Sequence, residues 1–463
     1  MKIPAYSSTT AESPIQAAQR STKRRRGIIK GALTGIIGKG TNLLVSAVTV
    51  PLTVRYLGSE GYGLWITISS AVTMFFVLDI GIASTLTNLI SRAYARDDRE
   101  LAATYFATAF WLVLGISALL GLAGLLFWPY IHWQSLFHTQ SPALSRDTSS
   151  AVAAAFIVFL CALPSGLATK VLAGYQEVHA ANWFGFGGSL LSLFAVIVVI
   201  YLHGSLATLV AAFAGSVAGA NAICLLWICI FHKPWMKPWP SKFQSGLIGD
   251  IFRSGGQFFL IQLSGLIVFN TDNLIISHYL SPAQVTPYNV TWRLVSYITA
   301  VPVLIFPALW PAYSEAYAKG DLAWIRRAYA RNRWITLGTL ALGCGVLLST
   351  GRKIIFLWAG AAAVPPAALL PLMCVWMIIF AITTNQSCLM GATTRVKKQA
   401  VFSLVSAGAN LALSIYLVRI FGIIGVLMGT IVSYLLFVVI PATLEVRSIL
   451  RGDNSVAEPV SQP

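Results

Sequence analysis

Residues 23–57 read KRRRGIIKGALTGIIGKGTNLLVSAVTVPLTVRYL, a basic cluster followed by a long, mostly apolar stretch. A bilayer core about 30 Å thick is crossed by about 20 apolar residues in a helix, so this stretch is long enough to span a membrane. Lys and Arg beside a span favour the cytoplasmic side and attract anionic lipid. The N-terminal part of the chain is therefore predicted to be a cytoplasmic tail followed by a transmembrane helix.

The composition of the whole chain agrees with this pattern. Of its 463 residues, 57% are hydrophobic and 10% are charged, and the mean hydropathy is +0.74. A soluble domain carries roughly 25% charged residues, so an ordinary water-soluble enzyme is excluded. The 32 Lys and Arg outnumber the 15 Asp and Glu, for a formal charge of +17. Nucleic-acid binding needs a large exposed basic surface, and a chain with so few charged residues offers little of it. We therefore expect no nucleic-acid partner, and we expect the basic residues to contact an anionic membrane surface.

Twelve stretches are long and apolar enough to be transmembrane helices. They cover residues 28–57, 62–91, 103–128, 150–173, 180–202, 206–231, 253–279, 287–314, 333–357, 366–390, 399–418 and 422–446. Their connections are short, and the longest are 129–149 and 232–252, so no loop can hold a soluble catalytic domain. The predicted fold class is an all-α integral membrane protein with twelve transmembrane helices, in the cytoplasmic (inner) membrane.

The distribution of basic residues tests this topology. An even number of spans places both termini on one side, and the basic cluster at residues 23–26 makes that side the cytoplasm. Of the 32 Lys and Arg, 25 then fall on the cytoplasmic side, five on the other side, and two, Lys39 and Arg293, inside spans. This strong bias supports the orientation.

The second half of the chain repeats features of the first half. At an offset of 223 residues, SRAYARDDREL over 91–101 aligns without gaps on SEAYAKGDLAW over 314–324, with five identical positions. Six helices per half make a parallel repeat, which predicts two six-helix bundles around a central cavity and transport by alternating access. The predicted parts are a disordered basic tail (1–27), an N-terminal bundle (28–231), a cytoplasmic linker (232–252), a C-terminal bundle (253–447) and a cytoplasmic tail (448–463).

Six ordered motifs suggest a family. They are RYLGSEGYGLW at 55–65, LDIGIASTL at 78–86, ARDDRE at 95–100, DNLIISHYL at 272–280, YNVTWRL at 288–294 and ALWPAYSEAYAKGD at 308–321. As a set, the motifs resemble those of the polysaccharide exporter (O-antigen flippase) family of the multidrug/oligosaccharidyl-lipid/polysaccharide exporter superfamily. The resemblance implies a transporter that flips an undecaprenyl-diphosphate-linked oligosaccharide, usually beside a polysaccharide polymerase and a chain-length regulator.

Four charged residues stand out inside predicted spans, where ionisable groups are costly and usually functional. At about 1.5 Å per residue, Lys39 and Asp79 lie at one depth, and Asp272 and Arg293 at another. One interpretation is that these are two buried ion pairs that tie neighbouring helices. Another is that Lys39 and Arg293 line the cavity and attract the diphosphate or acidic sugars of the substrate. A third makes Asp79 or Asp272 a proton or sodium site that drives transport.

Further polar residues in or near the spans complete the candidate substrate site. We add Arg55 as a basic residue, and Asn42, Asn270 and Asn289 as amides that could contact sugar hydroxyls. Such amides also commonly bond between helices in membranes. Gly425 and Gly429 form a GxxxG step that permits close helix packing.

No catalytic residue and no cofactor are expected. No metal site is expected either, because the six cysteines lie in apolar runs without metal-ligand spacing. Two other functions stay open. A cation-coupled multidrug antiporter of the same superfamily would share the architecture. A membrane polysaccharide polymerase or ligase would need a larger external loop.

Overall fold

A computed structural model describes residues 14–75, 81–137, 139, 141–393 and 395–452. These residues form helices joined by short loops, and no strand occurs among them. Within this part of the chain, nine helices are long and apolar enough to cross a membrane by length and composition: Leu33–Phe75, Arg99–Tyr130, Asp147–Gly174, Val178–Tyr201, Leu206–His232, Leu322–Ala359, Leu369–Ala392, Lys397–Phe421 and Ile423–Arg451. The chain is an all-helical, multi-pass membrane protein.

The helices follow one another in two series with an irregular linker between them. The first series is α1 (Pro14–Phe75), α2 (Ile82–Ala95), α3 (Arg99–Phe127), η2 (Trp128–Tyr130), α4 (Trp133–Phe137), α5 (Pro142–Gly174), α6 (Val178–Tyr201) and α7 (Leu206–Trp227). The linker holds η3 (Ile228–His232), η4 (Pro234–Met236), η5 (Pro240–Lys242) and η6 (Ser245–Leu247). The second series is α8 (Ile248–Tyr279), α9 (Pro282–Ala318), α10 (Leu322–Ala359), η7 (Ala361–Ala363), α11 (Leu369–Ala392), α12 (Val396–Phe421), α13 (Ile423–Tyr434), η8 (Leu435–Val439) and α14 (Ile440–Arg451).

The beginning of the chain differs from the sequence-based expectation. α1 starts at Pro14, so residues 14–27 are helical although the segment 1–27 is predicted to be disordered. Proline suits the first turn of a helix, and the Ala, Gln, Lys and Arg residues that follow it favour helix. Residues 1–13 lie outside the described part.

α1 also joins what the sequence separates into two spans. Gly58 interrupts it with φ 69° and ψ −179°, a conformation open to glycine and strained for other residues. This kink takes the place of the predicted turn between the first two spans. The second span continues into α2, with residues 76–80 outside the described part.

Three of the predicted spans are not among the nine helices. The second is divided as described above, and the seventh and eighth lie in α8 and α9, where the side chains of 252–261 and 300–308 are outside the described part. The count of twelve spans therefore stays a prediction.

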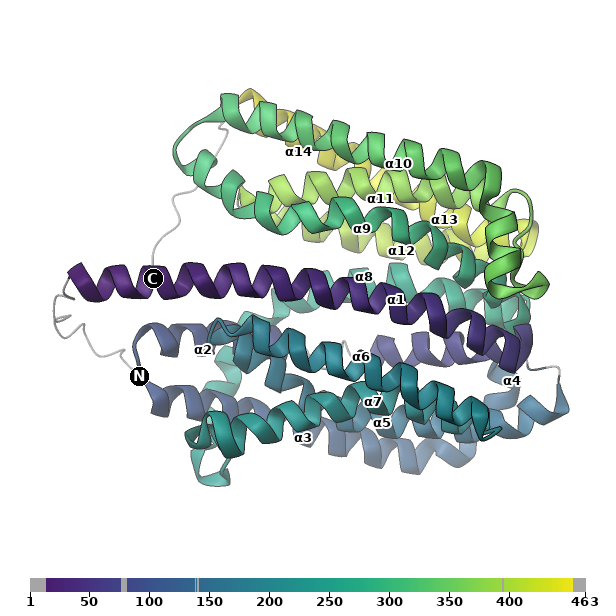
Figure 1. Cartoon of the computed structure of the whole chain (residues 1–463), viewed down its shortest axis with the longest axis horizontal. Helices are drawn as coiled ribbons and strands as arrows, with labels where there is room; N and C mark the ends of the chain where they lie inside the picture. Colours follow the sequence, from purple (N-terminus) through teal and green to yellow (C-terminus); the bar gives the residue numbers. More distant parts are fainter. Residues whose placement is uncertain (1–13, 76–80, 138, 140, 394, 453–463) are drawn as a thin grey trace.

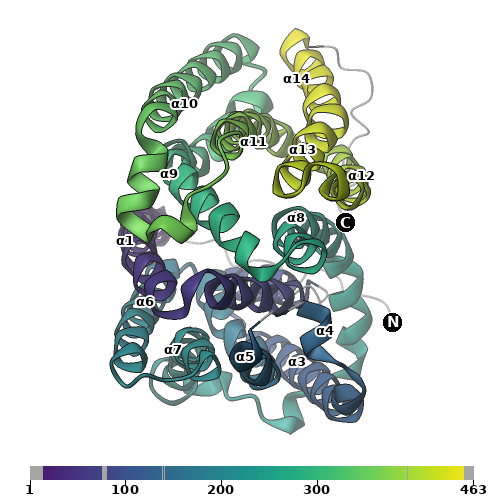
Figure 2. The same cartoon turned by 90° about the vertical axis from the view of Figure 1, so that its right-hand side faces the viewer.

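Helices of the two halves lie on opposite sides of the molecule (Figures 1 and 2). α3, α5, α6 and α7 lie on one side, α10 to α14 on the other, and α1 and α8 between them. α1 packs against α6 of its own half and against α9 of the other half, while α8 packs against α12. The largest buried hydrophobic cluster holds residues of both halves, including Trp65 and Trp376. Two further clusters lie within residues 82–251 and 313–449, so each half has a core of its own.

The molecule has two ends, which we call the Pro14 end and the Gly58 end. α1 begins and α14 ends at the Pro14 end, at the left of Figure 1, and the kink of α1 lies at the Gly58 end. At the Gly58 end the two halves approach closely, because a Cβ added to Gly63 would lie 1.7 Å from the carbonyl oxygen of Pro282. At the Pro14 end, Glu445 of α14 accepts hydrogen bonds from Arg395 and Lys398.

The predicted GxxxG step is confirmed as a packing site between α12 and α13. A Cβ on Gly425 would lie 2.1 Å from the carbonyl oxygen of Leu417, and one on Gly429 would lie 2.6 Å from Ser414 Oγ. Helices in lipid gain little from the hydrophobic effect, so close packing of this kind supplies much of their cohesion.

Replacing Gly429 with valine is expected to destabilise the protein by about 1–3 kcal/mol, the usual range for overpacking. The reason is that the new Cβ would meet backbone atoms of Ser414 at 2.8–3.0 Å, which cannot move aside cheaply. Chemical unfolding of the detergent-solubilised protein measures the effect. Gly408→Val on α12 is the control, because nothing lies within 4 Å of its added Cβ. Equal loss in both variants would contradict this explanation.

Candidate functional site

The predicted ion pair between Asp272 and Arg293 is absent from the structure. Asp272 lies on α8 and Arg293 on α9, but each has other partners. The sequence-based depth estimate starts the helix at Pro287, whereas α9 begins at Pro282. Arg293 therefore lies more than one turn deeper than assumed, and Tyr288 takes its place beside Asp272.

The carboxylate of Asp272 is buried, with 5% of the residue exposed. Its Oδ2 accepts hydrogen bonds from Tyr288 Oη at 2.5 Å and from Thr430 Oγ1 at 3.4 Å. Thr430 in turn accepts a hydrogen bond from Asn410 Nδ2 at 2.8 Å. Asp272 Oδ1 has no partner among the described residues, and an unsatisfied buried polar atom costs about 1–3 kcal/mol. Such a cost points to a ligand or a proton at this carboxylate.

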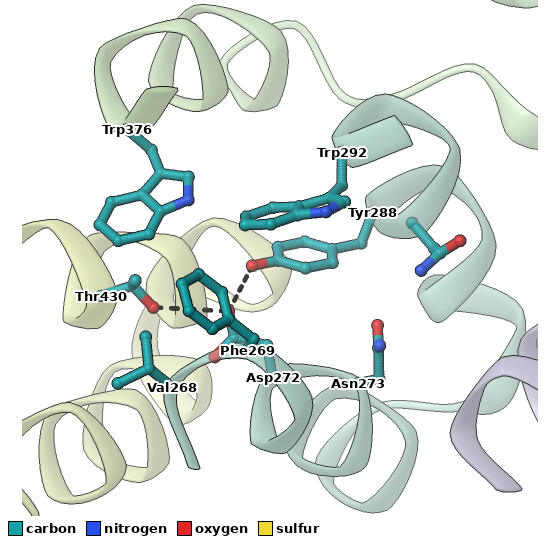
Figure 3. A pocket seen from close by; sticks show the side chains of 9 residues that line it. Val268, Phe269, Asp272, Asn273, Tyr288, Trp292, Trp376 and Thr430 are labelled. Atoms are coloured by element: carbon teal, nitrogen blue, oxygen red, sulfur yellow. Dashed lines mark hydrogen bonds between the residues drawn. The ribbon is translucent and has the colours of Figure 1, made fainter. Parts of the chain in front are cut away.

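An enclosed cavity of about 40 Å³ lies against the carboxylate (Figure 3). It is lined by Val268, Phe269, Asp272, Asn273, Tyr288, Asn289, Trp292, Trp376 and Thr430. A cavity of this size has room for a few water molecules or a small cation, and is too small for a sugar ring. Asn273 Oδ1 is a second buried oxygen without a partner among the described residues. We call this cavity the Asp272 pocket.

The chemistry of the Asp272 pocket suits a hard cation or a proton. Carboxylate, amide and hydroxyl oxygens are the ligands that hard cations prefer. The indole rings of Trp292 and Trp376 lie on one side of the pocket (Figure 3). Among the described residues there is no group of three or more His, Cys, Asp and Glu that could hold a metal ion.

Arg293 joins the two halves of the molecule. Its Nη1 donates a hydrogen bond to Ser46 Oγ of α1 at 2.9 Å, and its Nε donates to Asn289 Oδ1 at 3.3 Å. Tyr62 of α1 donates to the same Asn289 oxygen at 3.1 Å. The structure brings Arg293 and Asn289, two of the candidate substrate residues, onto the contact between α1 and α9.

Further hydrogen bonds cross between the halves near the Gly58 end. Asn273 Nδ2 donates to Ser70 Oγ at 2.9 Å, Thr286 Oγ1 to the Ser59 carbonyl at 2.5 Å, and Trp358 Nε1 to the Ala47 carbonyl at 2.7 Å. We call these bonds, together with those of Tyr62 and Arg293, the Gly58-end contacts. Side-chain hydrogen bonds between membrane helices average about 0.6 kcal/mol each, so these bonds add only a few kcal/mol to the apolar contact between the halves.

The Asp272 pocket and the Gly58-end contacts share two residues. Asn273 and Asn289 line the pocket, and the same two side chains bond to Ser70 and Tyr62 of the other half. A change in the occupant of the pocket therefore acts on groups that also hold the halves together.

The remaining predicted residues do not gather at this site. The side chains of Lys39 and Asn42 are exposed on α1, and Asn42 accepts a hydrogen bond from Ser189 of α6 at 2.5 Å. Arg55 is exposed and donates to the Leu357 carbonyl of α10 at 3.4 Å. Asn270 bonds within its own helix. Asp79, the predicted partner of Lys39, lies outside the described residues.

Sequence analysis missed several residues of the site, chiefly Tyr62, Tyr288 and Thr430. Tyr62 and Tyr288 stand inside the motifs quoted above, but a hydroxyl group in a span commonly bonds between helices and raises no signal by itself. Proline suits the first turn of a helix, so Pro282 was a possible start of α9. A depth estimate counted from Pro282 places Tyr288 at about the depth of Asp272.

Comparisons with known proteins agree with the sequence resemblance. The model of a family described as "Polysaccharide biosynthesis protein" matches residues 28–317. The chain is 24% identical over 304 residues to a putative O-antigen transporter of Salmonella typhi, covering 65% of this chain and 68% of the relative. It is 22% identical over 286 residues to a putative O-antigen export protein of Yersinia pseudotuberculosis, covering 60% and 63%.

Solved structures show the same fold at low sequence identity. An inward-facing multidrug resistance transporter of the MATE family, in the MOP superfamily, superposes with a TM-score of 0.68 at 15% identity, covering 89% of this chain and all of that one. An outward-facing structure of a MATE family transporter gives a TM-score of 0.65 at 16% identity, covering 94% and 97%. A MOP superfamily transporter from Pyrococcus furiosus gives 0.61 at 15% identity, covering 92% and 97%.

A cysteine pair tests the contact between the halves. Ser70→Cys combined with Asn273→Cys is expected to form a disulfide on mild oxidation, because the side chains that they replace approach to 2.9 Å. The pair Asn42→Cys with Asn273→Cys is the control, since Asn42 is exposed and bonds to α6. Gel mobility with and without reductant measures the cross-link. Similar yields for both pairs would contradict the arrangement.

Proposed function

The chain belongs to the polysaccharide biosynthesis protein family, and from this premise we propose that it flips an undecaprenyl-diphosphate-linked oligosaccharide across the inner membrane. It is a membrane exporter of polysaccharide precursors, like relatives named as O-antigen transporters. The finer step, from the cytoplasmic to the periplasmic leaflet, is our proposal. A polysaccharide polymerase and a chain-length regulator are its proposed partners.

The proposed architecture is twelve spans in two six-helix bundles, with both termini in the cytoplasm. It is supported by the placement of the start of α1 and the end of α14 at one end of the molecule (Figure 1). The ion-paired basic residues Arg395 and Lys398 lie at that end too, as cytoplasmic segments require. The Pro14 end is accordingly cytoplasmic, and the Gly58 end is periplasmic.

The observation that carries the proposal of alternating access is the set of Gly58-end contacts. They close the proposed periplasmic end, which corresponds to an inward-facing state. Because each of these hydrogen bonds is weak, breaking them costs little, and a ligand that binds the open state better can shift the balance toward it. Opening of the periplasmic end would break the bonds of Arg293 to Ser46 and of Asn289 to Tyr62.

The proposed substrate site combines basic residues with amides. Lys39, Arg55 and Arg293 would attract the diphosphate or acidic sugars, since guanidinium forks suit phosphate and lysine acts as a point charge. Asn42, Asn270 and Asn289 would contact sugar hydroxyls. The exposed position of Lys39 and Asn42 on α1 supports their access to substrate.

The Asp272 pocket is the proposed coupling site for a proton or a sodium ion. Its support is the buried carboxylate with one free oxygen, and the two residues that it shares with the Gly58-end contacts. Binding of a cation would reorganise Asn273 and Asn289, so the occupancy of the pocket and the closure of the periplasmic end become linked. Linkage of this kind works in both directions.

A cation-coupled multidrug antiporter is the second candidate function. The acidic Asp272 pocket and the shared fold with multidrug transporters favour it. The basic residues proposed for the substrate site oppose it, because they would repel a cationic drug.

Lys39→Ala and Arg293→Ala are each expected to abolish export while the protein still inserts normally, because each change removes a cation proposed to hold the diphosphate. Lipid-linked repeat units would accumulate on the cytoplasmic leaflet of a deletion strain carrying either variant. Arg352→Ala, which removes an exposed arginine near the end of α10, should leave export intact. Near-normal export by both variants would refute the proposed substrate site, and drug sensitivity with unchanged glycans would favour the antiporter.

Asp272→Asn keeps the shape of the side chain and removes its charge. Stabilisation of the purified protein by sodium ions or by protons should disappear, and export should fall by roughly 5–150-fold, the usual range for coupled sites. Thermal unfolding in sodium against choline, and across pH, measures the first effect. Glu315→Gln is the control, because Glu315 forms an exposed ion pair with Lys319. A variant that responds to both cations like the unchanged protein would exclude the pocket as a coupling site.

A further inference from the structure

An open groove of about 690 Å³ runs along the outer face of the first half, between α3, α5 and α7. Its walls are almost wholly apolar, and its volume falls in the range of about 300–1,000 Å³ usual for ligand sites. Figure 1 shows that α3 and α7 lie on the side of the molecule away from α10 to α14. The groove therefore faces the bilayer and lies outside the region between the halves.

Small residues on α3 and a proline on α5 create this groove. Ser117, Ala118 and Gly121 follow one another on the face of α3 that meets α5, where larger side chains would fill the space. Pro164 interrupts the hydrogen bonding of α5 at the opposite wall. From Phe110 to residue 125 the groove follows α3 for about 22 Å, most of the bilayer core.

The linker crosses α3 at one end of the groove. Trp111, the neighbour of the groove residue Phe110, donates a hydrogen bond from Nε1 to the Pro238 carbonyl at 3.0 Å. Gln244 donates from its backbone to Thr108 Oγ1 at 3.2 Å. The segment between these two bonds is therefore held against the same turn of α3 at which the groove ends.

The sequence of this linker, KPWMKPWPSKF over 233–243, combines lysines with aromatic residues. Trp239 is 58% exposed and Lys237 is exposed. Exposed Trp beside Lys is typical of segments at the membrane–water interface, where lysine meets lipid phosphate. Lys237 thus places a positive charge at headgroup level, beside the end of the groove.

Lys233 anchors the linker to the first half. Its ammonium donates to Glu177 Oε1 at 3.0 Å and lies 4.3 Å from the centre of the Tyr175 ring. Burial alone would raise the pKa of Glu177, but the hydrogen bonds from His232 and Lys233 outweigh burial and lower it. Glu177 therefore stays charged at neutral pH, and Lys233 is committed to this anchor. Lys237 is exposed, and it can meet an anionic group at the surface.

We propose that this surface binds one anionic glycerophospholipid of the cytoplasmic leaflet, with an acyl chain in the groove and its phosphate at Lys237. Charge complementarity at the linker end and the apolar groove beside it select this occupant. The isoprenoid chain of the transported lipid is a poorer fit, because its headgroup must pass between the halves and the groove faces away from them. The bound lipid would fix the linker, the only covalent connection between the two halves, to the first half.

The test uses the full-length chain in nanodiscs that contain phosphatidylglycerol with a photoreactive acyl chain. Mapping of the cross-linked peptides should find the label on residues 110–125 of α3 and on 160–165 of α5. Ala118→Trp would fill the groove and abolish this labelling. Leu119→Trp, on the same helix but outside the groove and 67% exposed in the unchanged protein, should leave it unchanged.

Lys237→Gln tests the headgroup contact without altering a buried position. It should lower the preference for phosphatidylglycerol over phosphatidylethanolamine by about fivefold, the factor expected for one lysine at an anionic surface. Lys397→Gln, an exposed lysine at the start of α12, is the control for charge alone. Native mass spectrometry of the purified protein gives the ratio of bound lipids.

Three outcomes would overturn the proposal. They are labelling spread evenly over the lipid-facing helices, an unchanged lipid preference in Lys237→Gln, and displacement of the label by undecaprenyl phosphate but not by phosphatidylglycerol. The last would assign the groove to the isoprenoid chain of the substrate.

Discussion

A bilayer core offers no water to the backbone, so each peptide group of a spanning segment needs a partner inside the protein. Helices meet this need locally, and the described chain is built from them almost throughout. Hydroxyl side chains follow the same rule, since Thr53 and Thr67 each bond to a carbonyl one turn earlier in their own helix. A polar group that cannot be satisfied in this way has to find a partner on another helix. Asp272 is such a group, and for this reason a site forms around it.

The Asp272 pocket and the Gly58-end contacts form one connected set of side chains. Asn273 and Asn289 line the pocket and also bond to Ser70 and Tyr62 of the other half. The contacts are individually weak, and a rigid seal would prevent the halves from separating. Weak bonds between the halves, joined to a small polar pocket, suit the proposed alternating access, which needs two states of similar free energy.

The outer surface of the first half holds the linker that connects it to the second half. The linker between the two halves is held to the first half by side-chain contacts. Lys233 attaches the linker to Glu177, and Trp111 attaches it to α3. Lys237 and Trp239 are exposed, as is typical of side chains at the membrane–water interface. Protein contacts and lipid contacts thus act together on one short segment, which gives the membrane a part in positioning the two halves.

Runs of apolar residues and ordered motifs along the chain were enough to predict the helical class, the membrane location and the family. The sequence also predicted the close packing at Gly425 and Gly429, and it singled out Asp272, Arg293 and Asn289 as candidates for the site. Which polar groups meet was decided only by the tertiary structure. Arg293 was expected beside Asp272, yet Asp272 is bonded by Tyr288 and by Thr430, which lies 158 residues away. The partner of a buried group depends on where each helix starts and how it is rotated against its neighbours, and neither composition nor spacing carries that information.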